Sequence, residues 1–191
     1  MFCHHLHLPL QSGDDRVLAA MRRRYTRRQY AAAVEYLFKK IRRMGLGADV
    51  MTGFPGEDEE AFEATCSLLQ ELPFSRLHVF AFSPRPGTRA AAMPGQVPST
   101  LIRERAARLR EIAAAREQEF AASLLGKKLS VLVEGRALPD GSGQGWSREY
   151  AQVRIVGAGA SRNSVFEVVP TRLEGACLVA ENPKKQTEKK K

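Results

Sequence analysis

The order of apolar strands and amphipathic helices in residues 5–82 constrains the fold more than any other feature of the sequence. Short apolar runs alternate there with segments whose apolar residues recur at helical spacing. The predicted strands are residues 5–10, 48–54 and 76–82, and the predicted helices are residues 12–23, 28–44 and 57–72. This order predicts an α/β fold in which a parallel sheet has helical crossovers. Three strands are too few to close a barrel.

The character of the chain changes after a long predicted helix that ends at Gly126. Beyond it, short runs rich in valine and isoleucine are separated by turn residues, which predicts a small antiparallel β-barrel. Strands are expected near residues 129–133, 153–156, 165–169 and 176–179. We therefore expect four parts, namely residues 1–97 as an α/β part, 98–125 as a connecting helix, 126–181 as a small barrel and 182–191 as a disordered basic tail.

Composition excludes several classes of protein. Hydrophobic residues make up 43% of the 191 residues, enough for a globular core. No apolar run approaches the roughly 20 residues of a membrane span, and the start shows no signal-peptide pattern. We therefore expect a cytoplasmic protein without a membrane partner. The three cysteines, Cys3, Cys66 and Cys177, lie far apart and form no Cys-x-x-Cys pair, so neither a disulfide framework nor a metal site is predicted from them.

Positive charge is concentrated in two places within a net charge of +9. Residues 22–43 hold nine lysines and arginines against one acid, and residues 182–191 hold five lysines against one acid. Such local density favours a polyanionic partner, most simply nucleic acid, slightly over a solvated helix face. DNA is not expected.

Two segments near the N-terminus carry candidate functional side chains. His5 and His7 share one face of a predicted strand and could bind a metal, but no third ligand is visible nearby, so a buried, hydrogen-bonded pair is favoured. Gln11 and Ser12 follow the same strand at its carboxyl end, where open α/β sheets bind ligands. Ser12 is also explained as a helix cap, an explanation that suits Gln11 poorly.

Two later segments are also candidates. Asp49 interrupts an apolar strand, and a buried carboxylate needs a partner. The glycines in residues 49–57 would let a ligand approach the backbone, and the alternative is a tight strand-to-helix turn. Trp146 and Tyr150 flank Arg148 in the second half of the chain. Aromatic and cationic side chains could contact RNA there, or the rings could simply pack.

Taken together, four ordered motifs resemble the methylthiotransferases of the radical-SAM superfamily. They are Cys-His-His-Leu-His-Leu-Pro-Leu-Gln-Ser-Gly at 3–13, Met-x-Arg-x-Tyr-Thr at 21–26, Asp-Val-Met-Thr-Gly-Phe-Pro-Gly-Glu at 49–57 and Phe-Ser-x-Arg-x-Gly-Thr at 82–88. The spacing resembles most the branch that acts on N6-threonylcarbamoyladenosine in tRNA, next to the anticodon, and the start at residues 3–8 favours it. Related branches act on isopentenyladenosine in tRNA or on a ribosomal protein.

The resemblance implies the C-terminal part of a radical-SAM partial (β/α) barrel, followed by a TRAM domain, an OB-like barrel that grips tRNA. It places S-adenosylmethionine against one set of residues and tRNA against another. The implied S-adenosylmethionine contacts are Gln11, Ser12, Arg23, Asp49 and Val50. The implied tRNA contacts are Lys127, Lys128, Arg148 and Arg154.

The iron–sulfur motifs of the family are absent from this sequence. Family members carry three cysteines for an auxiliary cluster and a Cys-x-x-x-Cys-x-x-Cys motif for the cluster that acts on S-adenosylmethionine. A 4Fe-4S cluster needs closely placed thiolates, which three scattered cysteines cannot supply. We therefore expect a C-terminal fragment, from a truncated gene or an incomplete sequence, that is inactive alone and holds neither catalytic residues nor metal ligands. The alternatives are a stand-alone RNA-binding module and an enzyme split over two chains.

Overall fold

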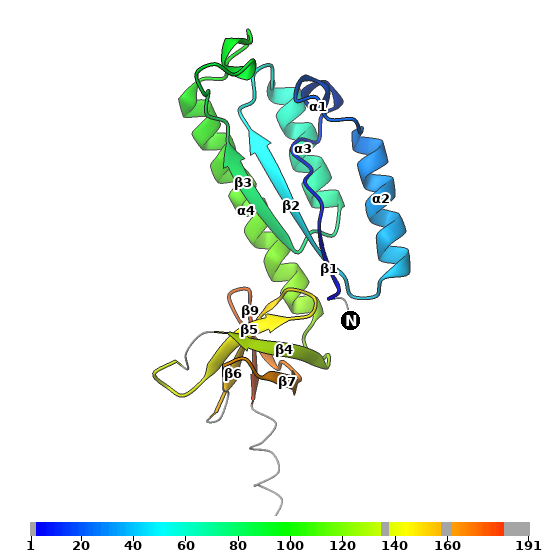
Figure 1. The fold of residues 1–191 in the computed structure, drawn as a ribbon, viewed down its shortest axis with the longest axis vertical. Helices are drawn as coiled ribbons and strands as arrows, with labels where there is room; N and C mark the ends of the chain where they lie inside the picture. The colour runs from blue at the N-terminus through cyan, green and yellow to red at the C-terminus, as the bar shows by residue number, and fades with distance from the viewer. Residues whose placement is uncertain (1–2, 135–137, 158–161, 182–191) are drawn as a thin grey trace, which may run out of the picture. The chain divides into compact units, whose positions relative to one another are not determined.

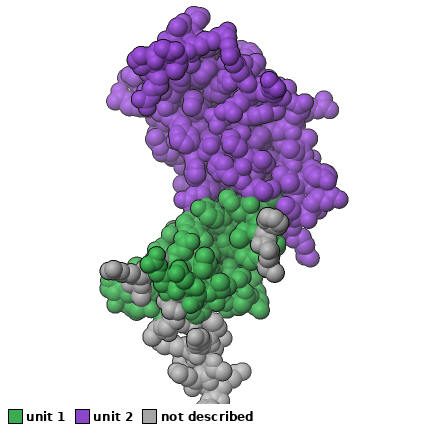
Figure 2. Space-filling model, viewed as in Figure 1, with its two compact units in different colours: residues 1–5, 43–45, 117–191 green, residues 6–42, 46–116 purple. Residues whose placement is uncertain are grey.

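The computed structural model describes residues 3–134, 138–157 and 162–181. The chain divides into two compact units (Figure 2). We call residues 6–42 and 46–116 the helix–sheet unit, and residues 1–5, 43–45 and 117–191 the β-rich unit.

The first sheet is three-stranded, in the order β1-β2-β3 (Figure 1). Its strands are β1 (His5–His7), β2 (Gly45–Thr52) and β3 (Arg76–Ala81). The accompanying helices are α1 (Asp15–Ala20), α2 (Arg27–Lys40), α3 (Glu59–Glu71), the short 3-10 helix η1 (Ala90–Ala92) and α4 (Ser99–Ser123). Because β2 and β3 are parallel and joined by α3, the predicted strand–helix–strand arrangement is confirmed for this pair.

Side-chain caps fix where the helices begin. The sequence predicted that the first helix begins at Ser12, but α1 begins after Asp14. The carboxylate of Asp14 accepts hydrogen bonds from the backbone N–H groups of Arg16 and Val17. A carboxylate two residues further along satisfies the first N–H groups of the helix, whereas Ser12 turns inward. Thr26 and Gln29 form a reciprocal capping box at the start of α2.

The end of α2 differs from the predicted end near residue 44. The helix stops at Lys40, and Ile41 already has extended backbone angles. Gly45, which follows the predicted helix, is the first residue of β2. A Cβ at Gly45 would lie 2.0 Å from the carbonyl oxygen of Glu149, so close packing of two backbone segments explains the glycine.

The two faces of the first sheet differ in character. One face forms the core with α2, α3 and α4, and includes Leu46, Ala48 and Val50 from β2 (Figure 1). Successive side chains of a strand point to opposite faces. The other face, which we call the open face, therefore carries His7, Asp49, Met51, His78 and Phe80, all of them partly or largely exposed.

The β-rich unit contains a six-stranded sheet in the order β7-β4-β5-β6-β9-β8. The strands are β4 (Leu129–Glu134), β5 (Gly143–Ser147), β6 (Gln152–Val156), β7 (Val165–Val168), β8 (Arg172–Glu174) and β9 (Cys177–Glu181). The expectation of a small all-β part is met, but the described strands do not close into a barrel. The sheet is also mixed, because β6 and β9 are parallel.

Each unit has its own apolar core. Leu109 and Ile112 of α4 belong to the core of the helix–sheet unit. Ala121 at the end of the same helix packs in the core of the β-rich unit with β-strand residues such as Val131 and Ile155. Within the described residues, no helix combines the length and the apolar character that crossing a membrane requires.

Candidate functional site

A cavity of about 320 Å³ lies in the helix–sheet unit beyond the carboxyl ends of β1 and β2. Its size is at the low end of small-molecule pockets, which span roughly 300 to 1,000 Å³. Its position is the one where parallel α/β sheets bind ligands. The cavity is lined by Gln11, Ala20, Met21, Arg22, Arg23, Met51, Phe54, Arg89, Ala90 and Met93.

The lining combines apolar and cationic groups. Met51, Phe54 and Met93 supply apolar surface, while Arg22, Arg23 and Arg89 supply guanidinium groups. A cavity of this kind suits a ligand that has an apolar or aromatic part and a carboxylate or phosphate group. All of these residues belong to the helix–sheet unit, so the cavity is complete within it.

The backbone at the cavity is strained at two positions. Gln11 has a φ of 69° and Arg22 a φ of 59°, in the left-handed region that residues other than glycine rarely adopt. Gln11 is held there by two β2 contacts, because its N–H donates to the Asp49 carbonyl and its own carbonyl accepts from Met51. Strain that neighbours hold in place is common at ligand sites.

Gln11 and Ser12 have different roles, although the sequence suggested both for the same pocket. Gln11 borders the cavity, whereas the Ser12 side chain is fully buried and lies 3.4 Å from the hydroxyl of Thr65. The Ser12 hydroxyl also accepts from the N–H of Asp14 at 3.2 Å. Ser12 thus ties the β1–α1 turn to α3 and does not line the cavity.

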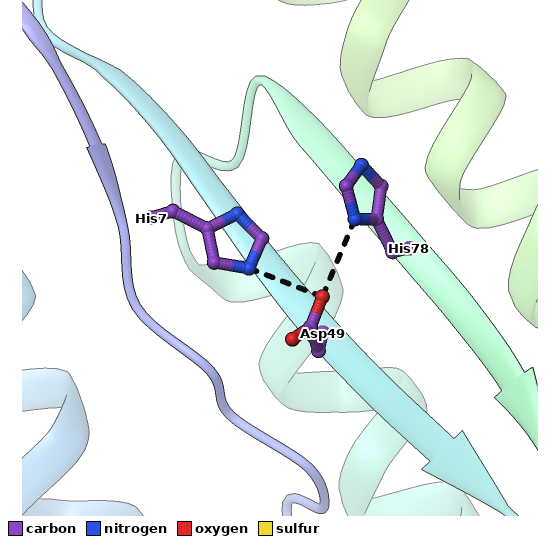
Figure 3. A group of neighbouring side chains, drawn as sticks. All are labelled: His7, Asp49 and His78. Carbon is purple, nitrogen blue, oxygen red and sulfur yellow. Dashed lines mark ion pairs between the residues drawn. The ribbon is translucent and has the colours of Figure 1, made fainter.

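Asp49 and Val50 also lie outside the cavity lining. Val50 is fully buried in the core, and Asp49 is on the open face. There the Asp49 Oδ1 atom lies 3.1 Å from His7 Nε2 and 3.3 Å from His78 Nδ1 (Figure 3). The partner expected for Asp49 is therefore present as two imidazoles. His7 is exposed, so the expected buried pair of His5 and His7 is wrong.

The predicted RNA contacts lie in the β-rich unit and differ in their surroundings. Lys127 and Lys128 are exposed, and Lys128 Nζ lies 3.5 Å from a carboxylate oxygen of Glu167. The Arg154 guanidinium forms ion pairs with Asp140 and Glu174, which hold it against the sheet. Arg148 is half-buried beside β4, where its N–H donates to the Ser130 carbonyl.

Three rings form a stack in the β-rich unit. The ring centroids of Trp146 and Tyr150 lie 4.7 Å apart, and those of Tyr150 and His5 lie 4.4 Å apart. Trp146 is on β5, because residues 143–147 pair with β4 and β6. The rings pack on one another, and Tyr150 remains 44% exposed.

The cysteines do not converge within either unit. Cys66, the single cysteine of the helix–sheet unit, is 1% exposed, and burial raises the pKa of its thiol to about 11. Cys3 and Cys177 belong to the β-rich unit. A cluster needs at least three thiolates at one place, so these residues do not fit an iron–sulfur cluster.

Sequence reasoning missed most of the apolar lining. Met51 and Phe54 were within a recognised motif, but Val50 was chosen in place of Met51. The period of two along a strand was the available signal, because Val50 points into the core and Met51 therefore points to the opposite face. Arg89 lies in a loop, and no local pattern brings it toward Gln11.

Comparison with known proteins finds one matching family model and relatives that share a name. Residues 1–69 match the model of the Radical SAM superfamily. A protein named tRNA-2-methylthio-N(6)-dimethylallyladenosine synthase from Methylacidiphilum infernorum is 38% identical over 81% of this chain and 36% of its own length. The protein of the same name from Syntrophotalea carbinolica is 39% identical over 90% of this chain and 39% of its own. That from Methylococcus capsulatus is 47% identical over 69% of this chain and 29% of its own. The chain thus spans about a third of the length of these relatives.

Proposed function

We propose that the chain is the part of a radical-SAM tRNA methylthiotransferase that contacts S-adenosylmethionine and tRNA, because residues 1–69 match the model of the Radical SAM superfamily and the similar proteins are named as tRNA-2-methylthio-N(6)-dimethylallyladenosine synthases. The observation that carries this proposal is the cavity bordered by Gln11 and Arg23, which lies largely within the segment related to the Radical SAM superfamily. The complete enzyme would replace a C–H group of a modified adenine by C–S–CH3. A tRNA substrate would place it in the cytoplasm.

The cavity lining suits the two ends of S-adenosylmethionine. The Arg23 guanidinium can pair with the carboxylate, and the Gln11 amide can both donate and accept hydrogen bonds. Met51 and Phe54 offer apolar surface to the adenine ring. When bound, S-adenosylmethionine supplies the methyl group. The residues of this chain bind and orient it, and no step through an iron–sulfur cluster is assigned to them.

Binding of S-adenosylhomocysteine, measured by isothermal titration calorimetry on the 191-residue chain, tests the cavity. Arg23→Met should weaken binding about tenfold or more, because a hydrogen bond to a charged group contributes about 1.5 to 3 kcal/mol. Arg24→Met is the matched control, since Arg24 is exposed and outside the cavity lining. Equal losses in both variants, or no binding to the unmodified chain, would overturn the assignment.

The β-rich unit is proposed to contact tRNA through Lys127 and Lys128 together with Arg148 and Arg154. Support comes from the exposure of both lysines and from the names of the relatives. Asp140 and Glu174 hold the Arg154 guanidinium in place through ion pairs, so Arg154 would contact tRNA from a fixed position.

Filter binding of tRNA across a salt series tests this surface. Affinity should fall steeply as the salt concentration rises. The double variant Lys127→Gln/Lys128→Gln should reduce the slope of the logarithm of the binding constant against the logarithm of salt concentration by up to about 2, roughly one unit per phosphate contact. Lys39→Gln/Lys40→Gln on α2 is the charge-matched control. A larger effect of the control pair would indicate that tRNA binds to α2 instead. Absence of tRNA binding at low salt would contradict a tRNA-binding role for this chain.

The substrate is proposed to be tRNA carrying N6-dimethylallyladenosine, because the relatives bear that name. N6-threonylcarbamoyladenosine is the second candidate, favoured by the Cys-His-His-Leu-His-Leu start at residues 3–8. Mass spectrometry of tRNA nucleosides from a strain lacking the gene separates them. Loss of the methylthio group from only one of the two nucleosides identifies the substrate, and its retention on both contradicts a tRNA substrate.

A further inference from the structure

We propose that His7, Asp49 and His78 form a binding site for a divalent transition-metal ion, most simply zinc, on the open face of the first sheet. Their three ligand atoms lie within 4.8 Å of one another. The site is separate from the cavity lined by Gln11 and Arg23 and contains no cysteine. The proposed metal site therefore does not depend on the proposed methylthiotransferase function.

The fold places one ligand on each of three adjacent strands. Asp49 and His78 are directly paired positions of the parallel β2–β3 ladder. On the other side of β2, the N–H groups of Leu8 and Leu10 donate to the carbonyls of Gly47 and Asp49, which brings His7 beside Asp49. The three side chains converge from neighbouring strands on one face of the sheet (Figure 3).

The distances suit a metal ion. The Asp49 Oδ1 atom lies 3.1 Å from His7 Nε2 and 3.3 Å from His78 Nδ1. Zinc binds nitrogen and oxygen at roughly 2.0 to 2.2 Å in tetrahedral sites, which puts neighbouring ligand atoms about 3.3 Å apart. Two of the three ligand pairs thus already have the spacing of a zinc site.

The donor set indicates which ions would bind. Two imidazoles and a carboxylate suit zinc and neighbouring first-row metals, whereas magnesium and calcium prefer oxygen ligands alone. The side chains of His7, Asp49 and His78 are 36%, 26% and 49% exposed, so an ion can reach them from solvent. Three protein ligands leave a coordination position for water or a further ligand.

A competing explanation is a hydrogen-bonded triad in which the Asp49 carboxylate accepts from two neutral imidazoles. It accounts for the same two distances. The two explanations predict different results, because a triad held only by hydrogen bonds would not be stabilised by added metal. Metal affinity and its dependence on each ligand therefore decide between the two.

The test titrates Zn²⁺ into the chelator-treated 191-residue chain, with calorimetry and thermal unfolding as readouts, in a Cys3→Ser background that removes the exposed thiol. We expect one equivalent to bind and to raise the unfolding midpoint. His7→Gln, His78→Gln and Asp49→Asn should each weaken binding at least about tenfold. His4→Gln, a histidine outside the site, is the matched control and should leave binding unchanged.

A spectroscopic readout needs no variant of the site. Co²⁺ added to the Cys3→Ser chain should give visible ligand-field bands of a nitrogen- and oxygen-ligated ion, without the thiolate charge-transfer band that Cys177 would produce. Absence of one-to-one binding at about millimolar metal, binding that survives the double variant His7→Gln/His78→Gln, or a thiolate band would each overturn the proposal.

Discussion

At the scale of single residues, Gly53 combines two constraints in the turn that follows β2. Its φ of 82° is in the left-handed region, and a Cβ there would lie 2.4 Å from Cγ1 of the buried Ile102. Gly53→Ala should therefore destabilise the helix–sheet unit by about 2 to 4 kcal/mol, from left-handed strain of about 1 to 2 kcal/mol plus overpacking. Urea unfolding followed by circular dichroism measures the loss.

Gly56 provides the matched control for Gly53. Its φ is 87°, but a Cβ would meet no atom within 4 Å. Gly56→Ala should therefore show only the backbone strain, about 1 to 2 kcal/mol. Equal losses at the two positions would mean that Ile102 yields to the new methyl group and that packing contributes nothing.

Cys66 illustrates how burial controls the chemistry of one side chain. Burial raises the pKa of its thiol to about 11, and it is 1% exposed, whereas Cys3 is exposed. Iodoacetamide at neutral pH should modify Cys3 rapidly and Cys66 only after unfolding, since the thiolate is the reactive form. Peptide mapping by mass spectrometry reads both sites, and modification of native Cys66 at the rate of Cys3 would contradict this.

The same shift has a consequence for stability. Because the pKa of Cys66 is higher in the folded state, the protonated thiol favours folding below its ordinary pKa. That contribution is lost as the pH rises through about 11. Cys66→Ala should therefore flatten the decline in unfolding midpoint between neutral and strongly alkaline pH.

At the scale of elements, a buried ion pair fastens α4 to the turn between β2 and α3. Arg105 Nη1 lies 3.0 Å from Glu57 Oε1, and the side chains are 4% and 1% exposed. The same carboxylate oxygen accepts from the Thr52 hydroxyl and from the Gly53 N–H, each at 2.9 Å. The pair thus fixes the loop that carries Phe54 to the cavity.

Breaking this pair on one side should be costly. Arg105→Met leaves a buried carboxylate without its cation, for an expected loss of about 3 to 5 kcal/mol. Arg105→Met combined with Glu57→Gln should cost less than the sum of the single variants, because the uncompensated charge is gone. Urea unfolding of the four proteins gives the coupling energy, and simple additivity would show that the ion pair contributes no specific coupling.

At the scale of the whole molecule, periodic patterns predicted the α/β half and the change to short strands after the long helix. The β-strand at Gly143–Ser147 was missed because it holds glycines and small residues and has no alternating apolar signal. The His7–Asp49–His78 group was missed because strand register, which no local pattern encodes, brings residues 71 positions apart together. Gln11 was predicted from its place after a strand's carboxyl end, whereas Arg23 was reached only through the family resemblance, and the binding role of both remains a prediction.

The division into two units predicts separable unfolding transitions. Trp146 is the single tryptophan and lies in the β-rich unit, so its fluorescence reports on that unit, while far-ultraviolet circular dichroism is dominated by helices of the helix–sheet unit. A Cβ at Gly145 would lie 2.0 Å from the carbonyl oxygen of Leu132 across the β4–β5 ladder. Gly145→Ala should therefore lower the fluorescence midpoint and leave the dichroism midpoint nearly unchanged, whereas Gly53→Ala should do the reverse. If both probes shift together in both variants, α4, which contributes to both cores, couples the units into one cooperative transition.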